Sequence, residues 1–132
     1  MSTLSPWLND LRKSIKLGLQ ALYKEPPQTA VEWADANFYM SAESSYNEGK
    51  WTTDPFQVAI LNAMGNDLIA VVNFVKSARI GYTKLLLANI GYKVQHKRRN
   101  VMMWSPTDPD AEDISKSHVN GLIRDVPVVR EL

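Results

Sequence analysis

Apolar residues near the start of the chain recur at intervals of one, three or four positions, which is the period of an amphipathic helix. Ser5 and Pro6 supply a capping hydroxyl and a proline for the first turn, and Pro26 with Pro27 ends the helix. The apolar stripe either covers the core of this same chain or docks on a partner. It consists of Trp7, Leu8, Leu11, Ile15, Leu19 and Leu22.

The pattern next predicts two short helices. Thr29 and Glu32 have the spacing of a capping box, in which each side chain accepts a hydrogen bond from the other residue's backbone N–H. Asp54 and Pro55 give a second cap-and-proline signal, before a helix that ends at Gly65. We expect the first helix to turn Val31, Trp33, Ala34 and Phe38 inward. In the second, the helical spacing is given by Phe56, Ile60, Leu61 and Met64.

The pattern changes abruptly in the middle of the chain. Residues 69–75 are a short β-branched apolar run, which is typical of a buried parallel strand. A polar loop follows over residues 76–83, and Lys84 with the leucines after it opens a helix. Strand, loop and helix in this order favour a phosphate-binding loop, because the first amides of a helix have no internal partners and attract an anion.

The loop departs from GxxxxGK[ST], the Walker A pattern of phosphate-binding loops. With Gly81 as the second glycine, Lys76 stands at the first glycine, Tyr82 at the lysine and Thr83 at the hydroxyl. In this interpretation Lys76 is an early cation, Gly81 lets the backbone approach a phosphate, and Thr83 reaches a bound magnesium ion. The alternative is an ordinary turn with surface lysines. The other candidate cations are Arg79 and Lys84.

A second strand and helix complete the predicted order. Residues 101–104 are another short apolar run, and Asp108 with Pro109 caps a helix from about Asp110 to Ile123. Strands joined through a helix by short loops are expected to be parallel, with a right-handed crossover. Their carboxyl ends, with Thr107 and Asp108, would then share the edge where such sheets bind ligands. The predicted fold class is α/β.

An aromatic residue and a glutamine precede the central segment. An adenine offers a flat face on which an aromatic ring can stack, and an edge with which an amide can pair. Phe56, Gln57 and the upstream Tyr46 fit that role as a set. The alternatives are that Phe56 belongs to the core and that Tyr46 is a surface aromatic.

Composition restricts the function only weakly. The 132 residues are 45% hydrophobic and 22% charged, with a net charge of +1, so bulk charge does not indicate nucleic-acid binding. The basic turn at residues 96–100 either contacts a phosphate backbone or is a solvated connection. The absence of cysteine excludes disulfides and thiolate metal sites. Neither a secretory signal nor a membrane-spanning run is expected.

Four stretches, in order and at matching spacing, resemble the amino-terminal part of the large terminase subunit of lambda-like tailed phages. They are TAVEWADANFYM, AESSYNEGKW, KSARIGYTK and WSPTDPDAED, within a resemblance from about Leu11 to Pro127. The resemblance implies a DNA-packaging motor in the host bacterial cytoplasm, with ATP and Mg²⁺ as cofactors. It also implies the small terminase subunit as a partner of the amino-terminal helix, and viral DNA and the portal as partners of the full-length protein.

The same resemblance implies a partial P-loop NTPase of the ASCE type, with parallel strands, flanking helices and an incomplete sheet. Residues 1–27 would be the helix and linker that contact the small subunit, and residues 28–132 the first part of the ATPase domain. Arg79 would be a transition-state cation, and Thr83 would hold magnesium through the nucleotide. The implied nucleotide-binding residues are Tyr46, Phe56, Gln57, Lys76, Ser77, Ala78, Arg79, Ile80, Gly81, Tyr82, Thr83 and Lys84.

Members of that family are several times longer, and neither their Walker B carboxylate nor their nuclease domain is recognisable in this sequence. We therefore expect ATP binding with weak or no ATPase activity from this chain alone. The alternative is a non-catalytic interaction module or prophage remnant. Such a module would bind the small subunit and self-associate through exposed sheet edges.

Overall fold

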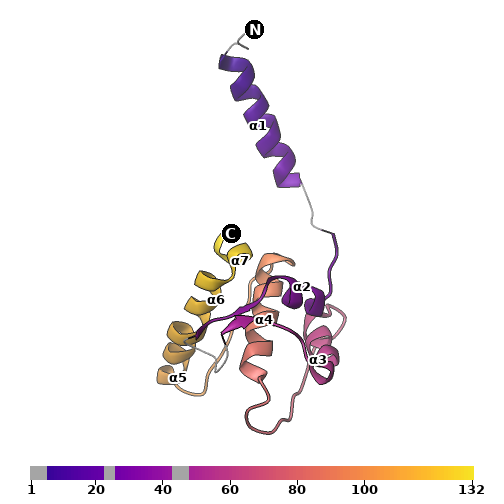
Figure 1. Ribbon diagram of the computed structural model, residues 1–132, viewed down its shortest axis with the longest axis vertical. Coiled ribbons are helices and arrows are strands. Elements are labelled where there is room, and N and C mark those ends of the chain that lie inside the picture. Colours follow the sequence, from indigo (N-terminus) through magenta and orange to yellow (C-terminus); the bar gives the residue numbers. More distant parts are fainter. Residues whose placement is uncertain (1–5, 23–25, 43–47) are drawn as a thin grey trace.

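The computed structural model, which describes residues 6–22, 26–42 and 48–132, has a helical body and one helix that stands apart from it (Figure 1). The separate helix is α1 (Pro6–Leu22), which begins at the predicted proline. Its apolar stripe is exposed, with Leu11 at 48%, Ile15 at 53% and Leu19 at 63%. The stripe therefore does not cover the core of this chain, and that alternative is wrong. The predicted cap Ser5 lies outside the described residues.

The body begins with α2 (Ala30–Asn37) and a small sheet. The capping box of α2 is confirmed, since Glu32 N–H donates to Thr29 Oγ1 at 3.2 Å and Thr29 N–H donates to Glu32 Oε2 at 2.8 Å. β1 (Tyr39–Met40) and β2 (Gly49–Lys50) pair in antiparallel fashion. In the described part of the chain this is the whole sheet, so its strands are neither those predicted nor parallel.

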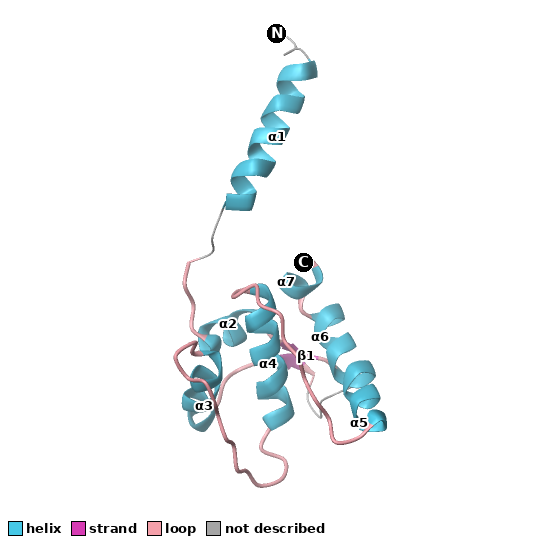
Figure 2. Cartoon of the chain, turned by 180° about the vertical axis from the view of Figure 1, so that it is seen from behind, coloured by secondary structure: helices cyan, strands magenta, loops and turns pink. Residues whose placement is uncertain are grey.

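Two longer helices form the centre of the body. α3 (Pro55–Gly65) begins after its cap Asp54 and ends at the predicted glycine. α4 (Tyr82–Gln95) begins two residues before the predicted start, and half of its residues are buried. It lies between α2 and α3 on one side and the carboxyl-terminal helices on the other (Figure 2).

The carboxyl-terminal part is one helical run with an irregular middle. It comprises α5 (Asp108–Asp113), the π-helical segment η2 (Ile114–Val119) and α6 (Asn120–Asp125). Its cap is Thr107 rather than Asp108, because Thr107 Oγ1 accepts the Asp110 N–H at 3.3 Å. α7 (Pro127–Arg130) then brings Val128 and Val129 onto the core.

The core sits where α2, α3 and α4 meet. Trp33 of α2 is fully buried, and its indole N–H donates to Gln95 Oε1 on α4 at 2.7 Å. α4 approaches this ring closely at Gly91, where an added Cβ would lie 2.5 Å from Trp33 Cη2. Helix packing around one tryptophan, rather than a sheet, therefore organises the body. Its other large buried residues include Phe38, Trp51, Leu61, Leu85, Tyr92 and Leu122.

The prediction of two buried strands is wrong for this chain. Residues 69–75 and 101–104 have no strand structure, and Val71, Val75 and Trp104 are 70%, 97% and 83% exposed. A strand needs a neighbour for its backbone N–H and C=O groups and a packed layer for its side chains. Neither segment has a neighbouring strand among the described residues. The apolar run at 69–75 therefore lies on the surface as a loop.

Candidate functional site

The loop before α4 projects from one end of the body, between α3 and α4 (Figure 2). Its residues 76–79 and Gly81 are exposed, whereas Ile80 is partly buried. Two of its residues have left-handed backbone conformations, Arg79 with φ 62° and Gly81 with φ 78°. Such a conformation is costly for a residue with a side chain, and it recurs at ligand-binding turns. The conformation of Arg79, which Arg98 shares in the turn after α4, makes the loop a candidate for a ligand-binding turn.

Gly81 caps α4 through its backbone. Its carbonyl accepts the N–H groups of Lys84 at 3.0 Å and Leu85 at 3.1 Å. A Cβ on Gly81 would lie 3.3 Å from Gln57 Nε2, and the φ of 78° also favours glycine. A glycine at this position therefore serves both the turn and the close approach of α3. A helix has no internal acceptor for the N–H groups of its first residues, which here are Tyr82 and Thr83.

Gln57 connects the start of α3 to the loop. It is 4% exposed, its Oε1 accepts the Asp54 N–H at 3.0 Å, and its Nε2 donates to the Ile80 carbonyl at 3.5 Å. Phe56 beside it is 54% exposed, so its assignment to the core is wrong. Tyr46 lies outside the described residues. The contact of these residues with adenine stays a prediction.

Lys76 lies over an aromatic ring at the base of the loop. Its Nζ is 5.5 Å from the centroid of the Tyr82 ring. That ring stacks on Phe74, with centroids 5.2 Å apart and an interplanar angle of 24°. From the sequence, Phe74 was expected only as part of the apolar strand at residues 69–75. The signal for its contact is an aromatic side chain two positions before Lys76.

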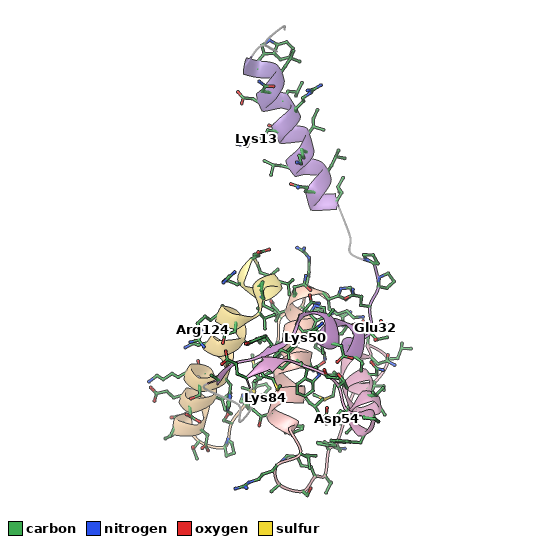
Figure 3. The ribbon with its side chains drawn as sticks, viewed as in Figure 1. Lys13, Glu32, Lys50, Asp54, Lys84 and Arg124 are labelled. Carbon is green, nitrogen blue, oxygen red and sulfur yellow. The ribbon has the colours of Figure 1, made fainter. Side chains whose placement is uncertain are left out.

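Lys84 has different surroundings from Lys76. It lines a small enclosed space with Tyr39, Ser41 and His118, and burial lowers the pKa of its ammonium group. Burial also lowers the pKa of His118, and the nearby charge of Lys84 adds to this effect. His118 Nδ1 is buried without a hydrogen-bond partner among the described residues. Figure 3 shows Lys84 in the body, far from Lys13 on α1.

The basic turn after α4 is partly neutralised. The Asp67 carboxylate accepts hydrogen bonds from Lys97 Nζ at 3.0 Å and from Arg99 Nη1 at 2.8 Å and Nη2 at 3.1 Å. The Asp67 carboxylate is therefore paired with two cations, Lys97 and Arg99. In the described part of the chain, no group of three or more acidic or histidine residues is placed to hold a metal ion.

The Asp67 cluster gives a pH-dependent prediction. The hydrogen bond from Lys97, with the charge of Arg99, lowers the pKa of Asp67. A lowered folded-state pKa stabilises the fold above the unfolded pKa of about 3.9, and this contribution is lost as pH falls through the folded value. We expect Asp67→Asn to be less stable than the unmodified chain at pH 7, with the difference shrinking below about pH 4. Urea midpoints measured from pH 7 to pH 3 test this, and a difference that grew with acid would contradict it.

Comparisons with known proteins agree on one family. Residues 45–132 match the family model described as the phage terminase large subunit gpA, ATPase domain. The chain is 54% identical over 127 residues to the terminase large subunit of Escherichia phage lambda, and 53% identical over 119 residues to that of Enterobacteria phage P21. These alignments cover 96% and 90% of this chain but 20% and 18% of the relatives, so the chain spans about a fifth of their length.

The remaining comparisons do not indicate a function. The chain is 54% identical over 43 residues to protein TfaD of Escherichia coli (strain K12), which covers 33% of this chain and 23% of that protein. No solved structure matches the chain. Among the described helices, none has the length and hydropathy that crossing a membrane requires.

Proposed function

The chain belongs to the phage terminase large subunit family, matched in its ATPase domain, and we propose that it binds ATP with magnesium at residues 76–84. The observation that carries the proposal is the exposed loop with left-handed Gly81 directly before the first amides of α4. α4 has 14 residues, so its dipole favours an anion at this end.

Each part of the loop has a role in this proposal. The backbone amides of residues 77–82 would surround the phosphates, with Ser77, Ala78 and Ile80 contributing main chain. Lys76 would neutralise charge on the β- and γ-phosphates. Lys84 would be a second cation at the same helix start, although its side chain lines the space formed with Tyr39, Ser41 and His118. Arg79 would stabilise the transition state, in its own chain or in a neighbouring subunit.

The residues also fit magnesium, although only in part. The exposed Thr83 lies in the first turn of α4, where a hydroxyl can reach an ion bound to the nucleotide. Magnesium would supply charge neutralisation between the phosphates. Turnover also requires a second carboxylate and a group that orients water, and residues 76–84 contain no acidic residue. We therefore expect binding with little or no hydrolysis.

Adenine would lie near the start of α3. Phe56 exposes more than half of its side chain there, and Gln57 lies one residue on, against the phosphate loop. Tyr46 would be the second aromatic. The Gln57 contact with Ile80 supports a link between the base and phosphate ends of the site.

The matched ATPase domain offers an explanation for the two exposed apolar segments, residues 69–75 and 101–104. We propose that residues 69–75 and 101–104 become parallel strands when further strands of a longer protein pair with them. Asp67 precedes the first segment and Arg99 precedes the second, and their side chains are paired at 2.8 Å. Both segments therefore leave the same corner of the body. Pairing would cover Val71, Val75 and Trp104, which are largely exposed in this chain.

A titration of the purified chain with ATP tests the nucleotide proposal. Calorimetry with and without magnesium, and with AMP in place of ATP, separates phosphate binding from base binding. We expect ATP affinity that depends on magnesium and exceeds the affinity for AMP. Equal affinities for ATP and AMP, or no binding of either, would contradict the phosphate site.

A second function is favoured by the exposed stripe of α1. We propose that this stripe docks the small terminase subunit, since an amphipathic helix separate from its body offers its apolar face to a partner groove (Figure 1). This role requires no nucleotide, so it also fits the alternative of an interaction module. We propose the host bacterial cytoplasm as the location of both roles.

Paired substitutions on two faces of α1 test the docking. Leu11→Ala with Ile15→Ala removes two apolar contacts, and should weaken small-subunit binding about tenfold or more. Asp10→Ala with Lys13→Ala is the control on other faces of the helix, and should leave binding nearly unchanged. Binding that survived the first pair, or the deletion of residues 1–25, would rule out docking through α1.

A further inference from the structure

Two stacked aromatic rings lie at the base of the loop before α4. Phe74 belongs to the segment before the loop and Tyr82 is the first residue of α4, so their stack joins the two ends of the loop. The centroid separation of 5.2 Å and the angle of 24° are those of an offset stacked pair. Tyr82 is half-buried although its neighbours Gly81 and Thr83 are exposed. The stack on Phe74 therefore holds the Tyr82 ring in place.

The Tyr82 ring attracts the ammonium group of Lys76. Lys76 is largely exposed, and a free lysine side chain at such a position samples many rotamers. Its Nζ lies 5.5 Å from the Tyr82 centroid, within the range of about 6 Å over which a ring attracts a cation. In the sequence pattern, Tyr82 occupies the position where the ordinary Walker A lysine stands. Lys76 therefore lies next to Tyr82, the residue that stands where the usual Walker A lysine would be.

We propose that Tyr82, supported by Phe74, is a positioning residue that holds the Lys76 ammonium at the base of the loop, beside the first turn of α4, ready for the β- and γ-phosphates of ATP. This inference rests on the proposed nucleotide site and adds a residue whose role differs from that of a phosphate ligand. The ring contributes only weak attraction, so an incoming phosphate, which carries full charge, takes the ammonium readily. The two rings therefore hold the Lys76 side chain in position before ATP binds, and they do not compete with the phosphates for its ammonium group.

Two substitutions of Tyr82 separate the ring from the hydroxyl. Tyr82→Leu removes the aromatic face and should weaken magnesium-dependent ATP binding about two- to fivefold, while AMP binding is unchanged. Tyr82→Phe keeps the face and should bind ATP like the unmodified chain. Phe74→Leu removes the supporting ring and should give a loss between these two. Circular dichroism and thermal melting of each variant check that the helices remain.

The contact itself has a spectroscopic readout that does not need nucleotide. Lysine amines reductively methylated with ¹³C give separate NMR signals, and the signal of Lys76 is assigned from its loss in Lys76→Arg. We expect a ring-current shift of this signal in the unmodified chain and in Tyr82→Phe, and its loss in Tyr82→Leu. Lys97, whose Nζ lies 5.8 Å from the Tyr92 centroid, is the internal control, and its signal should not move.

The outcomes distinguish this inference from the proposed function. If the unmodified chain binds ATP and Tyr82→Leu binds it equally well, the positioning role is wrong and the nucleotide site stands. A Tyr82→Phe variant as weak as Tyr82→Leu would also overturn the role, because the ring face is then not what acts. If the unmodified chain binds no ATP, the proposed function fails and the positioning role fails with it, whatever the Lys76 signal shows.

Discussion

Replacing Trp33 by alanine is expected to lower the free energy of unfolding by about 3–5 kcal/mol. The indole is fully buried between α2 and α4, and its N–H donates to Gln95 Oε1 at 2.7 Å. The substitution therefore leaves a large cavity and removes a buried hydrogen bond. A small domain with total stability of about 5–15 kcal/mol would lose much of it. Urea unfolding followed by circular dichroism measures the change.

Trp104→Ala is the matched control, because it deletes the same side chain from a residue that is 83% exposed. We expect the free energy of unfolding to change by no more than about 0.5 kcal/mol. Equal losses in the two variants would show that residues 101–104 are packed in solution. That result would contradict the surface loop described above.

Replacing Lys76 by alanine is expected to weaken magnesium-dependent ATP binding about ten- to hundredfold, as loss of a charged hydrogen bond to phosphate does. The fold should not change, since Lys76 is exposed and contacts only the Tyr82 ring among the described aromatic residues. Calorimetric titration gives the affinity, and a urea midpoint equal to that of the unmodified chain confirms the fold.

Lys13→Ala removes the same charge from α1, away from the loop (Figure 3), and is the control for net charge. Its ATP affinity should equal that of the unmodified chain. Equal weakening in both variants would mean that bulk charge, rather than a placed cation, attracts the nucleotide. Full affinity in Lys76→Ala would remove the early lysine from the site.

Local signals in the sequence predicted the helices well. Pro6, the Thr29–Glu32 capping box and Gly65 each stand at the helix boundary that their chemistry favours. The carboxyl-terminal helix was predicted with its cap one residue late, since Thr107 rather than Asp108 accepts the N–H of Asp110. These features depend on residues a few positions apart, so they do not need the rest of the fold.

The state of the two apolar segments and the contacts of the loop could not be predicted from the sequence, for a different reason. An apolar β-branched run such as 69–75 becomes a strand only if another segment offers its backbone, and the run itself does not say whether one is present. The stack of Phe74 on Tyr82 and the contact of Gln57 with Ile80 likewise join parts of the chain that local patterns treat separately.

The order of the residues alone determined the helices, their caps, the glycine-containing turn before α4 and the family, because each depends on spacing within a short stretch or on direct similarity. Only the tertiary structure decided that α1 stands apart with its stripe exposed, that α4 packs on Trp33 rather than on a sheet, and that Lys76 lies over Tyr82. Burial and long-range contacts depend on which surfaces meet in space, and a linear pattern of apolar residues does not specify their partners.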